Sequence, residues 1–138
     1  MARVKGKDTK PEMLIRRALH AEGFRYSLHS KRLPGHPDIV LRKYRAIVLV
    51  HGCFWHDHGC YKSTKPKAGS IDWKRKFREN RERDRRNIDS YLQLGWRVLV
   101  VWECAIVGKT KWDFDELIKE ISNWIESGRS YREIEGIG

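Results

Sequence analysis

The stretch Ala46-Ile-Val-Leu-Val-His-Gly-Cys-Phe-Trp-His-Asp-His-Gly-Cys60 joins an apolar run to a loop rich in histidine, cysteine and glycine. The apolar part, 46–50, is short and rich in β-branched side chains, which predicts a fully buried central strand. A second apolar segment, 96–102, predicts another strand. Two such strands should lie side by side in one sheet, so we expect the residues that follow them to meet at the same sheet end.

Helical and extended patterns alternate around these strands. The spacing of apolar residues, capping residues and glycines predicts three helices and two further strands. The helices are expected from Thr9 to Gly23, from Asp72 to Leu94 and from Asp113 to about Ser127, and the strands over 24–28 and 38–41, with a turn at Lys43-Tyr44. About ten residues at the C-terminal end are expected to be frayed. This order predicts an α/β fold with a mixed central sheet flanked by helices.

Length and charge narrow the possible partners. The 138 residues predict a single domain, 1–138, and 29 Lys+Arg against 18 Asp+Glu give a net charge of +11. Such a basic chain is first a candidate for binding nucleic acid, although a basic protein without a polyanionic partner is the alternative. No apolar run is long enough to span a membrane and the first residues lack a signal core, so we expect a cytoplasmic protein.

The cysteines and histidines predict a structural zinc site. Cys53, Cys60 and Cys104 with one histidine would supply the four tetrahedral ligands that Zn²⁺ prefers. Spacing alone does not choose between His56 and His58. Ordinary buried cysteines, or a disulfide between Cys53 and Cys60, are the alternatives.

A carboxylate and nearby histidines indicate phosphodiester chemistry. Asp38 begins a strand after a proline-rich turn, where its carboxylate can meet Mg²⁺ at a sheet end, although an isolated aspartate there is more often a turn residue. His51 follows the central strand and His56 lies in the same loop; either imidazole can move a proton near neutral pH. Glu12 suits a helix capping box, a role compatible with a catalytic one.

Aromatic and basic residues indicate a surface for DNA. Phe54 and Trp55 lie in the histidine-rich loop and Trp73 opens the basic helix, so these rings either wedge between base pairs or pack locally. The segment 74–86 carries eight basic and three acidic residues. Its basic excess favours contact with phosphate, beginning at Lys74 and Arg75, over an ordinary solvated face.

Taken together, these residues resemble the very-short-patch-repair (Vsr) endonuclease family. The matching blocks keep the family order and span nearly the whole chain: Lys7-Asp-Thr-Lys-Pro-Glu12, Leu33-Pro-Gly-His-Pro-Asp38, His51-Gly-Cys-Phe-Trp-His56, Cys60-Tyr61, Glu82-Arg-Asp-Arg-Arg86 and Leu94-Gly-Trp-Arg-Val-Leu-Val-Val-Trp-Glu-Cys104. The resemblance implies a restriction-endonuclease-like fold with structural zinc. It implies a Mg²⁺-dependent nick 5′ of the thymine in a T:G mismatch, which arises when 5-methylcytosine deaminates.

The resemblance also implies residue roles. Asp38 and the backbone carbonyl of Val50 would bind Mg²⁺, and His51 and His56 would be active-site histidines with Glu12 as the partner of His56. His58 would join the three cysteines on zinc, and the DNA would be entered by Met1, Phe54, Trp55 and Trp73. Family members commonly carry threonine where Val50 stands, a change that a carbonyl ligand tolerates. The acidic residue and lysine usual on the central strand of this fold are absent from 46–50.

The expected partner is double-stranded DNA with a T:G mismatch, bound by a monomer associated with the bacterial nucleoid, with other mismatch-repair proteins as further partners. Three alternatives differ in class. A restriction or DNA-processing nuclease of the same fold would cut matched and mismatched duplexes alike. A zinc-stabilised DNA-binding module would bind without cutting, and an RNA-binding domain would prefer single strands.

Overall fold

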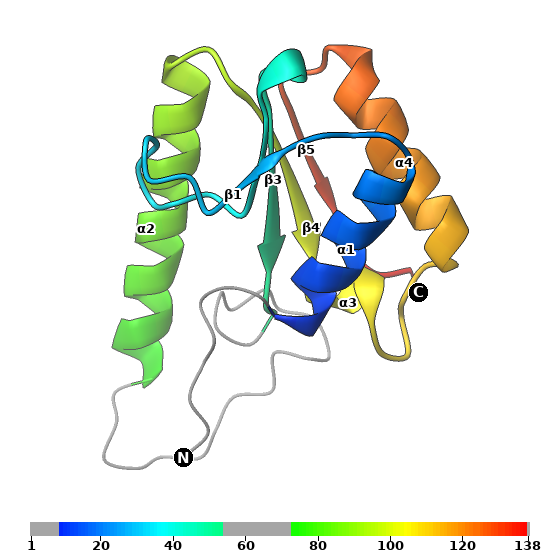
Figure 1. Ribbon diagram of the computed structural model, residues 1–138. Coiled ribbons are helices and arrows are strands. Elements are labelled where there is room, and N and C mark those ends of the chain that lie inside the picture. Colours follow the sequence, from blue (N-terminus) through cyan, green and yellow to red (C-terminus); the bar gives the residue numbers. More distant parts are fainter. Residues whose placement is uncertain (1–8, 54–72, 138) are drawn as a thin grey trace.

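The structure, a computed structural model, describes residues 9–53 and 73–137 (Figure 1). A five-stranded sheet with the order β1-β2-β3-β4-β5 forms its centre. Along the chain the elements are α1 (Lys10–Ala21), β1 (Ser27–Leu28), β2 (Ile39–Leu41), η1 (Arg42–Tyr44), β3 (Ala46–His51), α2 (Trp73–Gln93), β4 (Arg97–Trp102), α3 (Glu103–Ile106), α4 (Phe114–Ser127) and β5 (Tyr131–Ile134). The predicted α/β class, with a mixed sheet flanked by helices, is confirmed.

Strand direction changes at the middle of the sheet. The β1–β2 and β2–β3 pairs are antiparallel, whereas β3–β4 and β4–β5 are parallel. The apolar run 46–50 is the central strand that the sequence predicts, and 96–102 supplies its parallel neighbour. In this register Val50 lies opposite Val101 and His51 opposite Trp102, so both strands end at the same edge.

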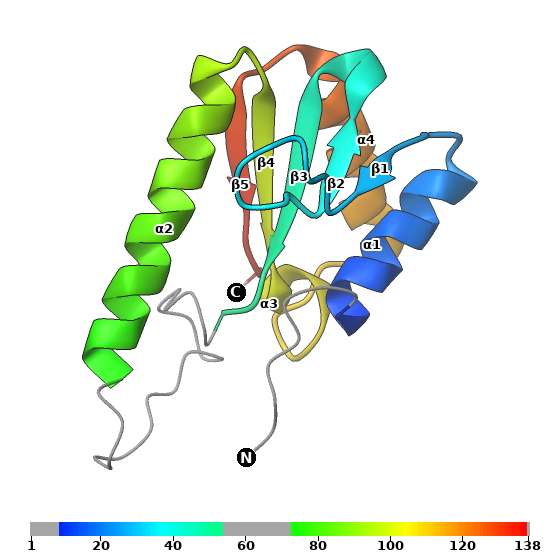
Figure 2. The ribbon, with the colours of Figure 1, turned by 60° about the vertical axis from the view of Figure 1, so that its left-hand side comes forward.

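Helices cover the two faces of the sheet unequally (Figures 1 and 2). Helix α2 lies on one face, and α1 and α4 lie on the other. Side chains alternate between these layers: Val48 and Leu99 belong to the larger apolar cluster with α1 and α4, and Ile47 and Val98 belong to the smaller one with Tyr91 of α2. This alternation follows from the two-residue period of a strand that is buried on both faces.

The C-terminal segment corrects one expectation. Residues Tyr131–Ile134 are not frayed, because they form β5 and pair in parallel with β4. Only Ile134 of this strand is buried, so the segment lacks the apolar alternation that would have predicted a strand. The predicted strand over 24–28 shortens to the two residues of β1, and the short helix α3 was not predicted.

A turn that packs against α2 sets the position of Asp38. Gly35 has φ +76°, and a Cβ atom there would lie 2.4 Å from Nδ2 of Asn87 on α2, so no larger residue fits without a shift. The hydroxyl of Tyr91 donates a hydrogen bond to the carbonyl of Pro34. The proline- and glycine-rich turn is thereby fixed against the helix, and Asp38 follows it at the start of β2.

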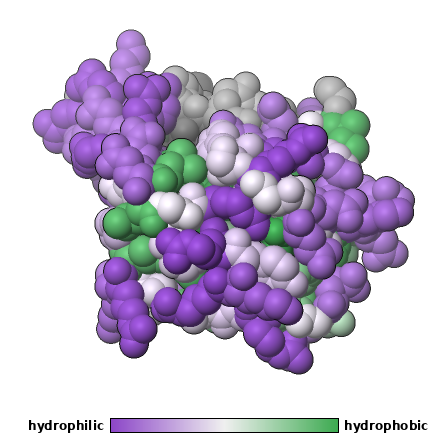
Figure 3. All heavy atoms as spheres, turned by 90° about the horizontal axis from the view of Figure 1, so that it is seen from above, coloured by the Kyte–Doolittle hydropathy of each residue, from purple (hydrophilic) through white to green (hydrophobic). Residues whose placement is uncertain are grey.

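The end of the molecule that carries η1 is mostly hydrophilic, with apolar residues in small separate areas (Figure 3). In the described part of the chain, no helix is both long and apolar enough to cross a membrane.

Candidate active site

Asp38 lies at the sheet end, between α1 and α2. Its Oδ2 accepts a hydrogen bond of 2.8 Å from the backbone N–H of Val50, which places this carboxylate beside the last residues of the central strand. The pKa of Asp38 is raised to about 7, mainly by burial. The hydrogen bond from Val50 lowers this pKa, and the nearby carboxylates of Glu12 and Asp84 add to the rise. A carboxyl group held in this way favours a cation as its partner.

Glu12 of α1 forms the second part of this site. The helix begins at the predicted Thr9 cap, whose hydroxyl accepts a 3.4 Å hydrogen bond from the N–H of Glu12. The Glu12 side chain is only 2% exposed. Its Oε2 lies 2.9 Å from both Nη1 of Arg16 and Nε2 of His29. The first turn of α1 therefore places the Glu12 carboxylate in the interior, next to Asp38.

His29 is a site residue that the sequence reasoning missed. One ligand atom from each of Glu12, His29 and Asp38 lies within 4.8 Å of the others. The three come from α1, the segment after β1, and the start of β2, so no local spacing links them. The only local signal was a histidine directly after the alternating segment 24–28.

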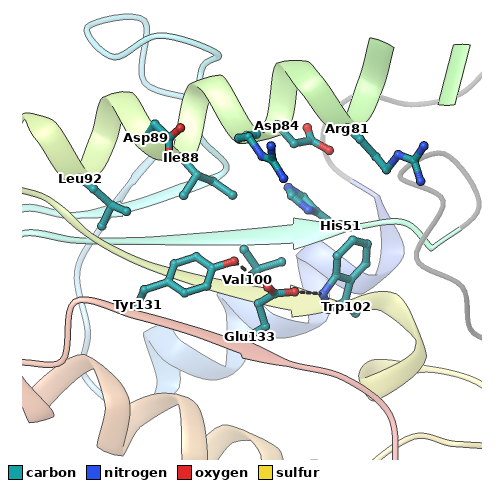
Figure 4. Close-up of a pocket in the computed structure, with 11 residues that line it drawn as sticks. His51, Arg81, Asp84, Ile88, Asp89, Leu92, Val100, Trp102, Tyr131 and Glu133 are labelled. Carbon is teal, nitrogen blue, oxygen red and sulfur yellow. Dashed lines mark hydrogen bonds between the residues drawn. The ribbon is translucent and has the colours of Figure 1, made fainter. Parts of the chain in front are cut away.

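His51 lies on the other side of the same strand end. As the last residue of β3 it is 8% exposed, and its ring makes an edge contact with the Trp102 ring, with centroids 5.2 Å apart. Figure 4 shows it at one end of a groove of about 530 Å³ between α2 and strands β4 and β5. The groove is lined by His51, Arg81, Asp84, Arg85, Ile88, Asp89, Leu92, Val100, Trp102, Tyr131 and Glu133. The predicted histidine thus faces a surface that contains two guanidinium groups.

The rim of this groove on β4 and β5 is fixed by one carboxylate. Glu133 accepts a 2.9 Å hydrogen bond from Trp102 Nε1 and a 2.8 Å bond from the Tyr131 hydroxyl (Figure 4). The strand that was expected to be frayed therefore supplies two residues that border the groove.

The two described cysteines of the predicted zinc site lie at one end of the sheet. Cys53 follows β3, and Cys104 follows the parallel strand β4, so both lie at the same end of the sheet. Both are buried. The backbone N–H of Cys53 donates to Oε1 of Glu103 at 3.2 Å, and that of Gly136 donates to Cys104 Sγ at 3.3 Å. Sulfur that accepts an N–H hydrogen bond is typical of a thiolate ligand shell, and this donor set fits Zn²⁺.

Helix α2 presents the predicted basic surface. All eight lysines and arginines of 74–86 are exposed, including Lys74 and Arg75. Arg75 forms an exposed ion pair with Glu79 at 3.3 Å. Trp73, at the first residue of the helix, is half-buried and packs against Phe77 with ring centroids 5.8 Å apart. The local packing alternative thus holds for part of this ring.

The structure brings Glu12 and Asp38 together beside Val50 and places His51 next on the same strand. It places Cys53 and Cys104 at the same end of the sheet. Six other predicted site residues lie outside the described residues: Met1, Phe54, Trp55, His56, His58 and Cys60. The helix cap predicted at Asp72 lies outside them as well. The proposed partner of Glu12, His56, is among these, whereas the described partners of Glu12 are Arg16 and His29.

Comparison with known proteins gives one family. The sequence model of the family described as "DNA mismatch endonuclease Vsr" matches residues 1–62. DNA mismatch endonuclease Vsr of Escherichia coli is 39% identical over 125 residues, which are 91% of this chain and 80% of that protein. Type II nicking enzyme V.NmeAIP of Neisseria meningitidis is 42% identical over 89% of each chain. Type II nicking enzyme V.XorIIP of Xanthomonas oryzae is 46% identical over 77% of this chain and 78% of its own.

The half-buried carboxyl of Asp38 generates a prediction about how stability depends on pH. Because burial raises the pKa of Asp38 to about 7, its contribution to stability is fully present below the unfolded value and is lost as the pH rises toward 7. In Mg²⁺-free buffer, the advantage of Asp38→Asn over the wild type in free energy of unfolding should therefore grow by about 2–3 kcal/mol from pH 5 to pH 8. Urea unfolding followed by tryptophan fluorescence measures this difference.

Asp115→Asn, a change of an exposed aspartate in the first turn of α4, is the matched control and should not reproduce the gain. If Asp38→Asn and the wild type differ by the same free energy of unfolding at pH 5 and at pH 8, the raised pKa of Asp38 is wrong.

Proposed function

The chain belongs to the Vsr family of DNA mismatch endonucleases, and from this premise we propose that it hydrolyses one strand of duplex DNA 5′ of the thymine in a T:G mismatch. It is a DNA endonuclease of a family that acts in DNA repair. The observation that carries the proposal is the Asp38 carboxylate, held at the sheet end by the N–H of Val50, with Glu12 beside it and His51 as the next residue of the central strand. We infer that the product is a nick suited to repair of deaminated 5-methylcytosine.

The site fits a hard divalent cation. Asp38 and Glu12 offer carboxylate oxygens, and the carbonyl of Val50 is the further oxygen that we assign to the metal, because its N–H is already tied to Asp38. Bound Mg²⁺ would polarise the scissile phosphate and offset its developing charge. The residues of the chain would then position the scissile phosphate, take a proton from the attacking water and give a proton to the leaving 3′-oxygen.

The histidines are assigned those proton transfers. One imidazole takes a proton from the attacking water as the new P–O bond forms, and the other protonates the 3′-oxygen as its bond to phosphorus breaks. His51 is held against Trp102 at the strand end. His56 belongs to the part of the chain outside the described residues, and we assign Glu12 as its partner there. Hydrolysis by this route consumes one water and leaves a 3′-hydroxyl and a 5′-phosphate.

The basic face of α2 is assigned to the DNA backbone. Lys74 and Arg75 are exposed at the start of the helix, next to Trp73. We propose that Trp73, Phe54, Trp55 and Met1 enter the duplex beside the mismatch. A wobble pair lowers the cost of unstacking, so recognition in part reads how readily the duplex deforms.

The zinc site is assigned a structural role. Cys53 and Cys104 follow neighbouring parallel strands, and His58 and Cys60 are the remaining ligands that we propose. Four protein ligands leave no open position for substrate. The metal would tie the segment that carries Phe54, Trp55 and His56 to the sheet end.

A nick needs one active site, so we propose that a single domain, 1–138, acts as a monomer in the bacterial cytoplasm at the nucleoid, with mismatch-repair proteins as partners. A second candidate function is nicking in company with a restriction system. It is favoured by the relatives called type II nicking enzymes. The preference for mismatched over matched duplex separates these two functions.

The first experiment compares end-labelled duplexes that differ only in T:G or T:A at one position, with Mg²⁺ or with EDTA. We expect a Mg²⁺-dependent nick 5′ of the mismatched thymine. Asp38→Ala should abolish cutting while duplex binding remains, because we assign this carboxylate to metal binding and not to DNA binding. Equal cutting of both duplexes would indicate a restriction or DNA-processing nuclease. Cutting by Asp38→Ala at the wild-type rate would refute the role of Asp38 as a metal ligand.

Removing positive charge from α2 should weaken DNA binding in a salt-dependent way. For Lys74→Ala combined with Arg75→Ala, we expect the slope of log Kd against log salt concentration to fall by about 1–2, since each lost phosphate contact releases fewer counterions. Fluorescence anisotropy from low to moderate salt measures this slope. Lys119→Ala, an exposed change on α4 at the opposite face of the sheet, is the control; an equal effect there would show general charge attraction instead of a binding face.

Zinc content tests the structural metal. The purified protein should contain one equivalent of zinc by elemental analysis, and Cys104→Ser should lose most of it together with a fall in Tm. Ser130→Ala, a change of an exposed residue before β5, should leave both quantities unchanged. Full zinc content in Cys104→Ser would remove this cysteine from the ligand set.

A further inference from the structure

The Glu12, His29 and Asp38 cluster contains one side chain for which the proposed chemistry has no role. We propose that His29 is a nitrogen ligand of the divalent-metal centre and completes, with Glu12 and Asp38, a mixed imidazole and carboxylate site. This inference rests on the proposed metal-dependent function. It adds a residue to that site and predicts which metals the site accepts.

The separations within the cluster fit coordination of one cation. With metal–ligand distances of about 2.1 Å, neighbouring ligands of an octahedral ion lie ~3.0 Å apart and opposite ligands ~4.2 Å apart. The Nε2 atom of His29 lies 2.9 Å from Oε2 of Glu12. One ligand atom of Asp38 lies within 4.8 Å of both. A cation can therefore bring the three atoms into its first shell through small side-chain movements.

The backbone ties His29 directly to Asp38. Strand β1 pairs Leu28 with Ile39, and the N–H of His29 donates a 3.1 Å hydrogen bond to the carbonyl of Asp38 just beyond that pair. His29 has φ +47°, a left-handed conformation that costs energy for a residue with a side chain. This conformation holds the imidazole at the start of β2, where Asp38 also lies.

A purely structural ion pair explains less of this arrangement. Arg16 and His29 both contact Oε2 of Glu12, so His29 could serve only to neutralise a buried carboxylate. That role is already supplied by Arg16, four residues along the same helix. It also gives no reason for a ring nitrogen of His29 to lie near the Asp38 carboxylate. A carboxylate oxygen has further lone pairs, so Glu12 can keep its contact with Arg16 and still face a cation.

A nitrogen ligand changes the metal preference of the site. Mg²⁺ prefers oxygen ligands, whereas Mn²⁺ and Co²⁺ accept imidazole readily. We therefore expect the wild type to bind Mn²⁺ more tightly than Mg²⁺ by a margin that depends on His29. Removing the imidazole should reduce that margin and leave an oxygen-only site.

The experiment uses the full zinc-containing chain without DNA and Mn²⁺ as the probe. Electron paramagnetic resonance of free Mn²⁺ gives its affinity, and competition gives that of Mg²⁺. Spin-echo modulation of bound Mn²⁺ detects a directly bound imidazole ¹⁴N. His29→Gln should lose this ¹⁴N modulation and lower Mn²⁺ affinity roughly tenfold, with a smaller loss for Mg²⁺.

His36→Gln is the matched control, because His36 is exposed, lies in the same segment and has the same φ of +47°. It should keep the Mn²⁺ affinity and the ¹⁴N modulation of the wild type. Unchanged modulation in His29→Gln, or an equal loss of both metals with no ¹⁴N modulation in the wild type, would overturn the proposal. Asp38→Asn tests the metal centre separately from the role of His29. If this variant retains full Mn²⁺ affinity, the proposed metal centre itself is wrong.

Discussion

The parallel pairing of β3 with β4 is the constraint on which the rest of the site depends. Parallel strands end at the same edge, and the register sets Val50 beside Val101 and His51 beside Trp102. Cys53 and Cys104 follow these two strands and therefore lie at the same end of the sheet, although their positions differ by 51 in the sequence (104 − 53). A shift of one residue would turn every side chain of β3 to the opposite face and dismantle both the core and the site.

Carboxylate burial is an energetic cost of this arrangement. Glu12 is 2% exposed, and burial raises the pKa of Asp38 to about 7, so the fold keeps two acids where water solvates them poorly. Arg16 and His29 offset part of this cost at Glu12, and the Val50 N–H offsets part of it at Asp38. Two acids retained together in this way are understandable if a cation joins them when the enzyme is loaded.

The elements predicted from the sequence are those whose signal is local. A fully apolar run identified β3, a capping box identified the start of α1, and an apolar stripe identified α4, because each pattern lies within one segment. Strand β5 was missed because three of its four residues are not buried and its stability comes from pairing with β4. His29 was missed for a similar reason: its contacts with Glu12 and Asp38 arise only when three separate segments meet. The resemblance supplied Asp38, His51 and Glu12, and it carried no signal for a histidine after β1.

The alternation of a β-strand gives the proposed reaction its geometry. Val50 packs toward the cluster that contains α1 and α4, and His51, the next residue, lies on the α2 face beside the groove. The carboxylates that we propose as metal ligands and the histidine thus flank the end of one strand from two directions. A phosphodiester laid across that end would meet the cation on one side and a proton-transfer group on the other, as an in-line displacement requires. The basic residues of α2 border the histidine side, so the helix that we propose to bind the DNA backbone would also set the direction from which the DNA strand enters the site.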